Sequence, residues 1–155
     1  MGMYTKVNLI IPIKNETEKN VKDILIAMFD GLDVEEMEAK QLEIPKHKLF
    51  EDGRRVWFPA SGGSYYFTGT VNSKIKYTSD VGENQMVLHI DTDFKNYNDE
   101  IKLFLDWICP YIDEEHLYRF LGYYQYEEDT NPTLCFYGKD KILQFTNNNV
   151  QGDVS

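Results

Sequence analysis

The chain has 155 residues, 42% of them hydrophobic, and its 16 Lys and Arg against 26 Asp and Glu give a net charge of −10. The hydrophobic content excludes an intrinsically disordered chain, and the charge disfavours binding to nucleic acid or anionic lipid. No apolar run reaches the length of about 18 residues that a membrane-spanning helix needs, so no membrane association is expected. We predict one domain over residues 1–146 and a C-terminal tail over 147–155.

The negative charge is concentrated in the second half of the chain. Residues 1–80 carry a net charge of −1, whereas residues 81–155 carry −9. Such asymmetry selects partners rather than folds, because the resulting field attracts basic proteins and cations. A basic protein is therefore the expected partner.

The N-terminal part predicts a strand followed by a helix. The strand covers Val7–Ile13. Asn15 is expected to cap the helix, with Glu18 completing a capping box, and Gly31 to end it. Between them, apolar residues recur at the spacing of one helical face. These are Val21, Ile24, Leu25, Met28 and Phe29.

Residues 32–55 give no clear signal, and short helical and extended pieces both remain open for them. Strands are expected next at 56–58, 64–68 and 74–78, joined by glycine-containing turns as in an antiparallel meander. The segment Ser61–Ser64 lacks the Lys-Ser/Thr of a phosphate-binding loop and is interpreted as a hairpin turn.

Residues 86–95 alternate between apolar and polar side chains, which predicts a half-buried strand. Its polar face carries His89, Asp91 and Asp93, an imidazole and two carboxylates that suit Mn, Fe or Zn. The alternative is an ordinary solvated strand face, since no other segment supplies an obvious further ligand. No cofactor is therefore expected.

A second helix is predicted from about Asn98 to Cys109 or beyond, and Pro110 is expected to end or kink it. Its core stripe consists of Tyr97, Ile101, Phe104, Leu105, Ile108 and Ile112.

Two further rows are expected on this helix. Leu103, Trp107 and Tyr111 form a second apolar stripe. Asp99, Asp106 and Asp113 fall within about 40° of each other, opposite the core stripe. A helix that touches one sheet needs one apolar stripe. The second is either covered by the C-terminal hairpin or residues 32–55, or is offered to a partner.

The C-terminal part predicts strands at 118–126, 133–137 and 142–145, with the acidic turn Glu127–Asp129 between the first two. The element order β-α-βββ-β-α-βββ predicts an α+β domain, in which two helices pack on one face of a mainly antiparallel sheet.

The two cysteines, Cys109 and Cys135, match no metal-binding spacing and lie in apolar runs, so we expect buried free thiols. A thiol–imidazole pair with His116 is the catalytic alternative. Free thiols and the lack of a signal-peptide pattern at the N-terminus indicate a cytoplasmic protein.

These features favour a non-enzymatic acidic protein that binds a basic protein by surface occlusion, of the inhibitor, immunity or phage-accessory type. In size, acidity and element order the chain resembles many small proteins of phages and bacterial mobile elements. The expected contact residues are Asp99, Leu103, Asp106, Trp107, Tyr111, Glu127, Glu128 and Asp129.

Three alternatives remain open at this point. One is a subunit of a larger phage or bacterial assembly, and another is a homodimer formed through exposed strands. The third is a small metal-dependent hydrolase built on His89, Asp91 and Asp93.

Overall fold

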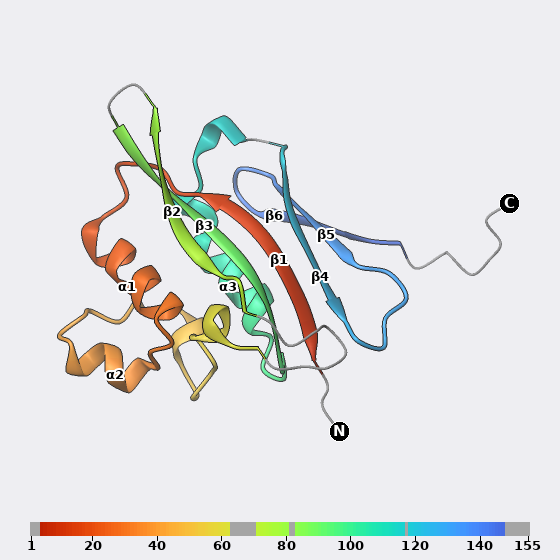
Figure 1. Cartoon of the computed structure of the whole chain (residues 1–155), viewed down its shortest axis with the longest axis horizontal. Helices are drawn as coiled ribbons and strands as arrows, with labels where there is room; N and C mark the ends of the chain where they lie inside the picture. Colours follow the sequence, from red (N-terminus) through yellow and green to blue (C-terminus); the bar gives the residue numbers. More distant parts are fainter. Residues whose placement is uncertain (1–3, 63–70, 81–82, 117, 148–155) are drawn as a thin grey trace, which may run out of the picture.

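The computed structural model describes residues 4–62, 71–80, 83–116 and 118–147. Helices and strands follow one another along this part of the chain as Figure 1 shows. They are β1 (Thr5–Pro12), α1 (Lys19–Phe29), α2 (Val34–Ala39), β2 (Lys74–Asp80), β3 (Glu83–Phe94), α3 (Glu100–Ile108), β4 (Phe120–Tyr126), β5 (Thr133–Tyr137) and β6 (Ile142–Thr146). Short 3-10 helices lie at Lys48–Phe50, Phe58–Ala60, Cys109–Tyr111 and Glu114–His116. No helix among the described residues is long and apolar enough to span a membrane.

The strands form one antiparallel sheet in the order β2-β3-β1-β4-β5-β6. The N-terminal strand β1 lies in the middle, where Leu9 faces Ile90 of β3 on one side and Gly122 of β4 on the other. Strand β1 thus joins the hairpin β2-β3 to the meander β4-β5-β6.

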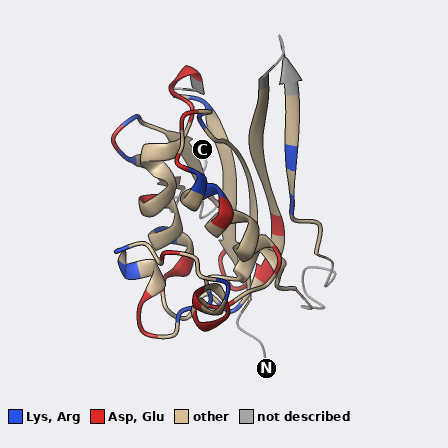
Figure 2. Cartoon of the chain, turned by 90° about the vertical axis from the view of Figure 1, so that its left-hand side faces the viewer, with Lys and Arg blue, Asp and Glu red and all other residues tan. Residues whose placement is uncertain are grey.

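Alternation along β1 gives the sheet one covered face and one open face. Val7, Leu9 and Ile11 are fully buried, whereas Ile10 between them is 49% exposed. The helices lie on one side of the sheet (Figure 2), and α1 and α3 contribute their apolar faces to the same core. The α+β architecture expected from the sequence, with helices on one face of an antiparallel sheet, is confirmed.

Helix α1 begins later than predicted. Its N-cap position is Glu18, which makes no side-chain hydrogen bond to the helix, so the capping box of Asn15 and Glu18 is wrong. The segment before the helix instead turns tightly, with the N–H of Thr17 donating to the carbonyl of Lys14 (3.1 Å). This turn uses the residues that the prediction placed in the first helical turn.

The end of α1 agrees with the prediction. Gly31 adopts a left-handed conformation (φ +81°), and the N–H of Leu32 reaches back to the carbonyl of Ala27 (3.0 Å). This is a Schellman motif, in which glycine avoids the steric cost that a Cβ would bring.

Residues 56–58 form no strand, contrary to the prediction. Val56 and Trp57 lie in a turn, and Phe58 opens the 3-10 helix that contains Pro59. The apolar side chains that suggested a strand fill the core instead, since Phe58 is fully buried and stacks on Phe94 with ring centroids 4.8 Å apart.

Other predictions fall partly or wholly outside the described residues. These are the strand at 64–68, the second half of the turn at 61–64, and all of the tail 147–155 except Asn147.

A β-bulge interrupts β4 between Phe120 and Gly122. At Gly122 (φ +144°) the backbone passes so close to β1 that a Cβ would lie 1.9 Å from the carbonyl oxygen of Asn8. Only glycine allows this approach. The pairing of β1 with β4 ends at Leu9 and Gly122, and beyond that point the two strands separate.

We predict that Gly122→Ala lowers the free energy of unfolding by about 3 kcal/mol or more, because the clash is with backbone atoms that cannot move aside. Gly53→Ala is the control, since Gly53 also has a positive φ (+66°) but nothing lies within 4 Å of its added Cβ. It should cost about 1 kcal/mol. Urea denaturation measures both, and equal costs would contradict the close approach of β4 to β1.

Candidate functional site

Trp107 lies in the core rather than on the surface of α3. It is 5% exposed, and its ring meets that of Phe50 edge to face with centroids 5.0 Å apart. Phe50 belongs to the 3-10 helix Lys48–Phe50, so the segment 32–55 covers the second apolar stripe. Leu103 and Tyr111, at either end of that stripe, are half-buried. Trp107 therefore offers a partner only the small part of its ring that remains exposed.

A buried carboxylate fixes this cover to the start of α3. Glu100 is fully buried and accepts the backbone N–H groups of Arg55 (2.9 Å) and Asn98 (3.1 Å). Arg54 adds a bond from its side chain to the carbonyl of Lys48 (2.9 Å). Since a buried charge is costly without hydrogen bonds, these donors stabilise the closed arrangement.

The row of three aspartates predicted along the second helix does not form, because α3 is short. Pro110 prevents its continuation. Asp99 precedes the helix as its N-cap residue with a φ of +58°, and only Asp106 lies within it. Asp113 follows the next 3-10 turn, where its carboxylate accepts a hydrogen bond from Gln85 (2.6 Å).

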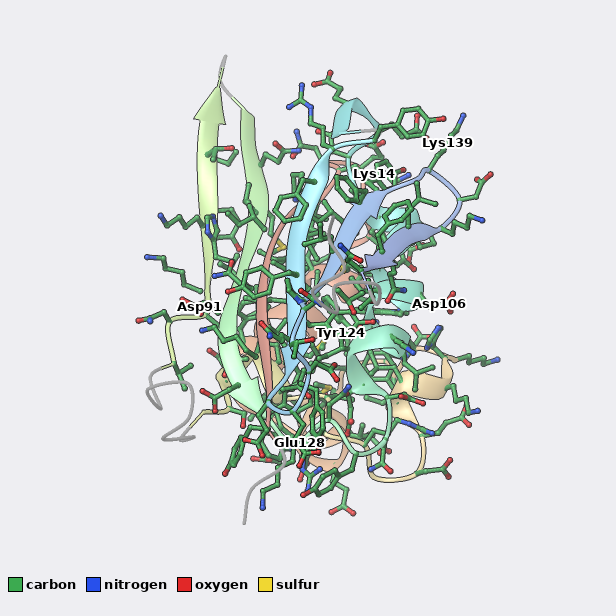
Figure 3. All side chains as sticks on the ribbon, turned by 90° about the vertical axis from the view of Figure 1, so that its right-hand side faces the viewer. Lys14, Asp91, Asp106, Tyr124, Glu128 and Lys139 are labelled. Carbon is green, nitrogen blue, oxygen red and sulfur yellow. The ribbon has the colours of Figure 1, made fainter. Side chains whose placement is uncertain are left out.

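The acidic turn Glu127–Asp129 lies apart from Asp106. Figure 3 shows Glu128 at the end of the sheet and Asp106 on the side of the helices. Asp99 precedes α3 as its N-cap residue, and its charge contributes, after burial, to raising the pKa of Tyr124 on β4 to about 12. The expected contact residues thus do not form one surface: Asp106, Trp107 and Tyr111 lie together, and the turn Glu127–Asp129 lies apart from them.

Asp106, Trp107 and Tyr111 border a surface hollow of about 670 Å³ between α1, α3 and residues 43–47. Two contacts hold its walls. Asn20 donates to the carbonyl of Glu43 (2.8 Å) and accepts from its N–H (3.1 Å). His47 bonds Asp106 through Nε2 (2.8 Å), while its Nδ1 accepts the N–H of Leu49 (3.0 Å). In the neutral ring the proton therefore sits on Nε2, which donates to Asp106.

Negative charge and aromatic surface coincide in this hollow. Three acidic residues line it, Glu18, Glu43 and Asp106, against one lysine, Lys46. The rings of Trp107 and Tyr111 lie beside them with centroids 6.0 Å apart. Carboxylates and aromatic faces both attract cations, so the hollow has the chemistry of a cation site.

His89, Asp91 and Asp93 point to the same side of β3, as their alternation requires, but they do not form a metal centre, and Asp93 is fully buried instead of lying on a solvated face. Asp91 is occupied by an ion pair with Lys6. The pKa of His89 is lowered, first by burial and then by the charges of Lys76 and Lys74. No group of three His, Cys, Asp or Glu side chains in the described part of the chain is placed to hold a metal ion.

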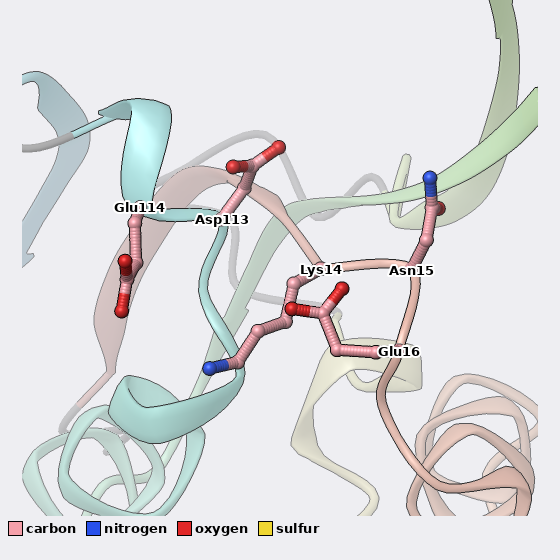
Figure 4. A pocket seen from close by; sticks show the side chains of 5 residues that line it. All are labelled: Lys14, Asn15, Glu16, Asp113 and Glu114. Atoms are coloured by element: carbon pink, nitrogen blue, oxygen red, sulfur yellow. The ribbon is translucent and has the colours of Figure 1, made fainter.

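A polar hollow near the end of β1 is shown in Figure 4. It is lined by Lys14, Asn15, Glu16, Asp113 and Glu114. The side chains point in different directions instead of converging. Their mixed charges and divergent geometry give no arrangement for proton transfer or metal binding, and we assign no chemistry to this hollow.

Both cysteines are buried and not disulfide-bonded. Burial raises the pKa of Cys135 to about 12. The pKa of Cys109 is raised by burial first and then by Asp106 and Asp140. Because the thiolate is the nucleophile, neither residue is suited to covalent catalysis. The side chain of His116, the proposed partner of such a thiol, lies outside the described residues.

Comparisons with models of protein families, with curated proteins and with solved structures found no match. The candidate site therefore depends on geometry and charge alone.

Sequence reasoning did not place Glu18, Glu43 or His47 among the contact residues. Two of them lie in the segment 32–55, which has no regular period. The second apolar stripe of α3 was the one indication of their role, because an apolar stripe needs a segment packed over it, and residues 32–55 are that segment.

We predict that Trp107→Ala lowers the free energy of unfolding by about 3–5 kcal/mol, because it leaves a cavity under Phe50. Tyr97→Ala, at a position 56% exposed, should cost less than about 1 kcal/mol, including its cation–π contact with Arg55. Chemical denaturation gives both values. A similar small cost for the two variants would place Trp107 on the surface.

We also predict that the native thiols react slowly with a disulfide reagent at neutral pH. The raised pKa of each thiol keeps it protonated, and unfolding in urea should release both for rapid reaction. Absorbance of the released thiolate measures the rates. Rapid reaction of the folded protein, without urea, is the result that would contradict the burial of Cys109 and Cys135.

Proposed function

We propose that the protein is a non-enzymatic interaction protein that binds a basic partner protein by receiving an arginine or lysine side chain in the hollow between α1, α3 and residues 43–47. The observation that supports this is the juxtaposition of three carboxylates, from Glu18, Glu43 and Asp106, with the rings of Trp107 and Tyr111. Bound there, the partner's surface is occluded.

The overall charge would act before contact is made. A net charge of −10 attracts a basic partner over a distance of about one Debye length and raises the association rate at low salt. Long-range attraction of this kind gives no specificity by itself, so the hollow must select what is bound.

Selection would come from the rigidity and shape of the hollow. Asn20 clamps residue 43 to α1 through two hydrogen bonds, and Trp107 is held by Phe50. A side chain entering a preformed site loses less free energy to ordering of the protein. Arginine is favoured over lysine, because its planar guanidinium would stack on the half-buried ring of Tyr111 and bond two carboxylates at once.

Two features of the residues that line the hollow affect its affinity for a cationic side chain. Lys46 places a positive charge at the hollow, which opposes a cationic ligand. Asp106 already bonds His47, so Glu18 and Glu43 are the carboxylates with no described hydrogen bond to their side-chain oxygens. The free buried thiols fit the reducing compartment, such as the cytoplasm, that the sequence indicates.

The test uses a short peptide with one central arginine and its citrulline analogue, which has the same shape without the charge. Calorimetry should detect binding of the arginine peptide that weakens with salt, and none of the citrulline peptide. We predict that Glu43→Gln and Glu18→Gln each weaken binding about two- to fivefold, and that Lys46→Gln strengthens it by a similar factor.

Two variants with equal changes in charge serve as controls. Glu35→Gln and Lys40→Gln change exposed residues at α2 that do not line the hollow, and they should leave the affinity unchanged within about twofold. Equal binding of the citrulline peptide, or an effect of Glu35→Gln as large as that of Glu43→Gln, would exclude the proposed site.

A further inference from the structure

A second hollow, of about 560 Å³, lies on the open face of the sheet, opposite the helices. Its lining is mainly apolar and includes Ile10 of β1, Val87 of β3, and Phe120 and Tyr123 of β4. Ile10 is 49% exposed and Phe120 is 54% exposed, whereas their neighbours Leu9, Ile11 and Leu121 are buried.

The β-bulge accounts for this hollow. Beyond Leu9 and Gly122 the strands β1 and β4 no longer pair, and the space between them is bordered by Ile10 and Phe120. The open face here therefore forms an apolar groove instead of a flat surface, and it results from backbone geometry that Gly122 fixes.

The charged groups around this groove are mainly cationic. Arg119 lines it, and its side chain makes no ion pair or hydrogen bond with another described residue. Lys76 and Lys74 stand beside it on β2, opposite Val87 and His89 in the register.

The titratable side chains near the groove are consistent with this positive charge. Both lysines contribute to lowering the pKa of His89, after burial. On the same face, Asp91 forms an ion pair with Lys6. Asp113 accepts a hydrogen bond from Gln85 of the lining and is the one carboxylate that the described contacts join to the groove. A chain with a net charge of −10 thus presents an apolar groove with a cationic margin.

We propose that this groove binds a short segment of a second partner protein in which apolar side chains are flanked by carboxylates. The apolar side chains would replace water over Ile10 and Phe120, and the carboxylates would meet Arg119 and Lys76. This surface lies across the sheet from the hollow at Trp107 and is independent of it.

A second copy of the chain is a poorer occupant. In a symmetric contact through this face, each copy would bring the same cationic margin toward the other. Two molecules of net charge −10 also repel each other before contact. A carboxylate-bearing segment of another protein brings no cationic margin of its own, so its carboxylates are attracted by Arg119 and the two lysines once it reaches the groove.

Two exposed phenylalanines on this face provide a matched test. Phe120 lies in the groove, whereas Phe145, 56% exposed on β6, lies outside it. Each ring contacts Phe136, with centroids 5.3 and 5.8 Å apart. Replacing either phenylalanine by serine removes about the same exposed surface. A cooperative urea-unfolding curve for each variant verifies that it is folded.

The probe is a fluorescein-labelled hexapeptide with Leu-Phe flanked by two glutamates on each side, and its counterpart has glutamine in place of glutamate. Fluorescence anisotropy should show the acidic peptide binding about tenfold tighter or more than the neutral one. Phe120→Ser and Arg119→Glu should each weaken its binding about fivefold or more, while Phe145→Ser and Glu43→Gln leave it unchanged.

Three results would overturn the proposal. In the first, the two peptides bind equally well or neither binds. In the second, Phe120→Ser and Phe145→Ser lower the affinity for the acidic peptide by the same factor. In the third, sedimentation shows a dimer that Phe120→Ser dissociates. The last assigns the groove to a second copy of the chain. Glu43→Gln alters only the hollow at Trp107. A failed test of the apolar groove is therefore distinguishable from a failed test of the arginine site.

Discussion

The pairing of β1 with both β3 and β4 is the constraint on which the other features depend. This N-terminal strand fills the gap between two segments from the second half of the chain, and it alone joins the hairpin β2-β3 to the meander β4-β5-β6. A slip of one residue in its register would move Val7, Leu9 and Ile11 from the core to the open face. The position of β1 therefore fixes which side chains of its neighbours face the helices.

The sheet in turn separates two surfaces of opposite character. On the helix side, the segment 32–55 closes over Trp107 and leaves a hollow in which Glu18 and Glu43 stand beside aromatic rings. On the other side, the strands separate at the bulge and leave an apolar groove beside Arg119. The net charge of −10 hides this difference, because it sums over both faces. We propose that this difference lets the protein bind a basic partner on one face and an acidic segment on the other.

Much of the fold could be predicted because periodicity reports which side of an element is buried. The strand containing His89, the helical face of α1 and the strands at the C-terminus follow from it. Periodicity does not report what covers a buried face. It therefore did not decide whether the stripe of Trp107 is buried or exposed. It also led to a wrong strand prediction for residues 56–58, whose apolar side chains reach the core from a turn and a 3-10 helix. The bulge at Gly122 was not foreseen either, since a close approach of two strands depends on which strands are neighbours.

The central claim is that the two faces of the sheet bind ligands of opposite charge independently. It is tested most directly by ¹⁵N–¹H spectra of the labelled protein, titrated with the arginine peptide and the acidic peptide separately and together. The arginine peptide should shift the indole N–H of Trp107 and the amides of Asn20 and Glu43, which border the acidic hollow. The acidic peptide should shift the amides of Ile10 and Phe120, with each set unchanged by the other peptide. Shifts of the same residues by both peptides, or competition between them, would contradict the account.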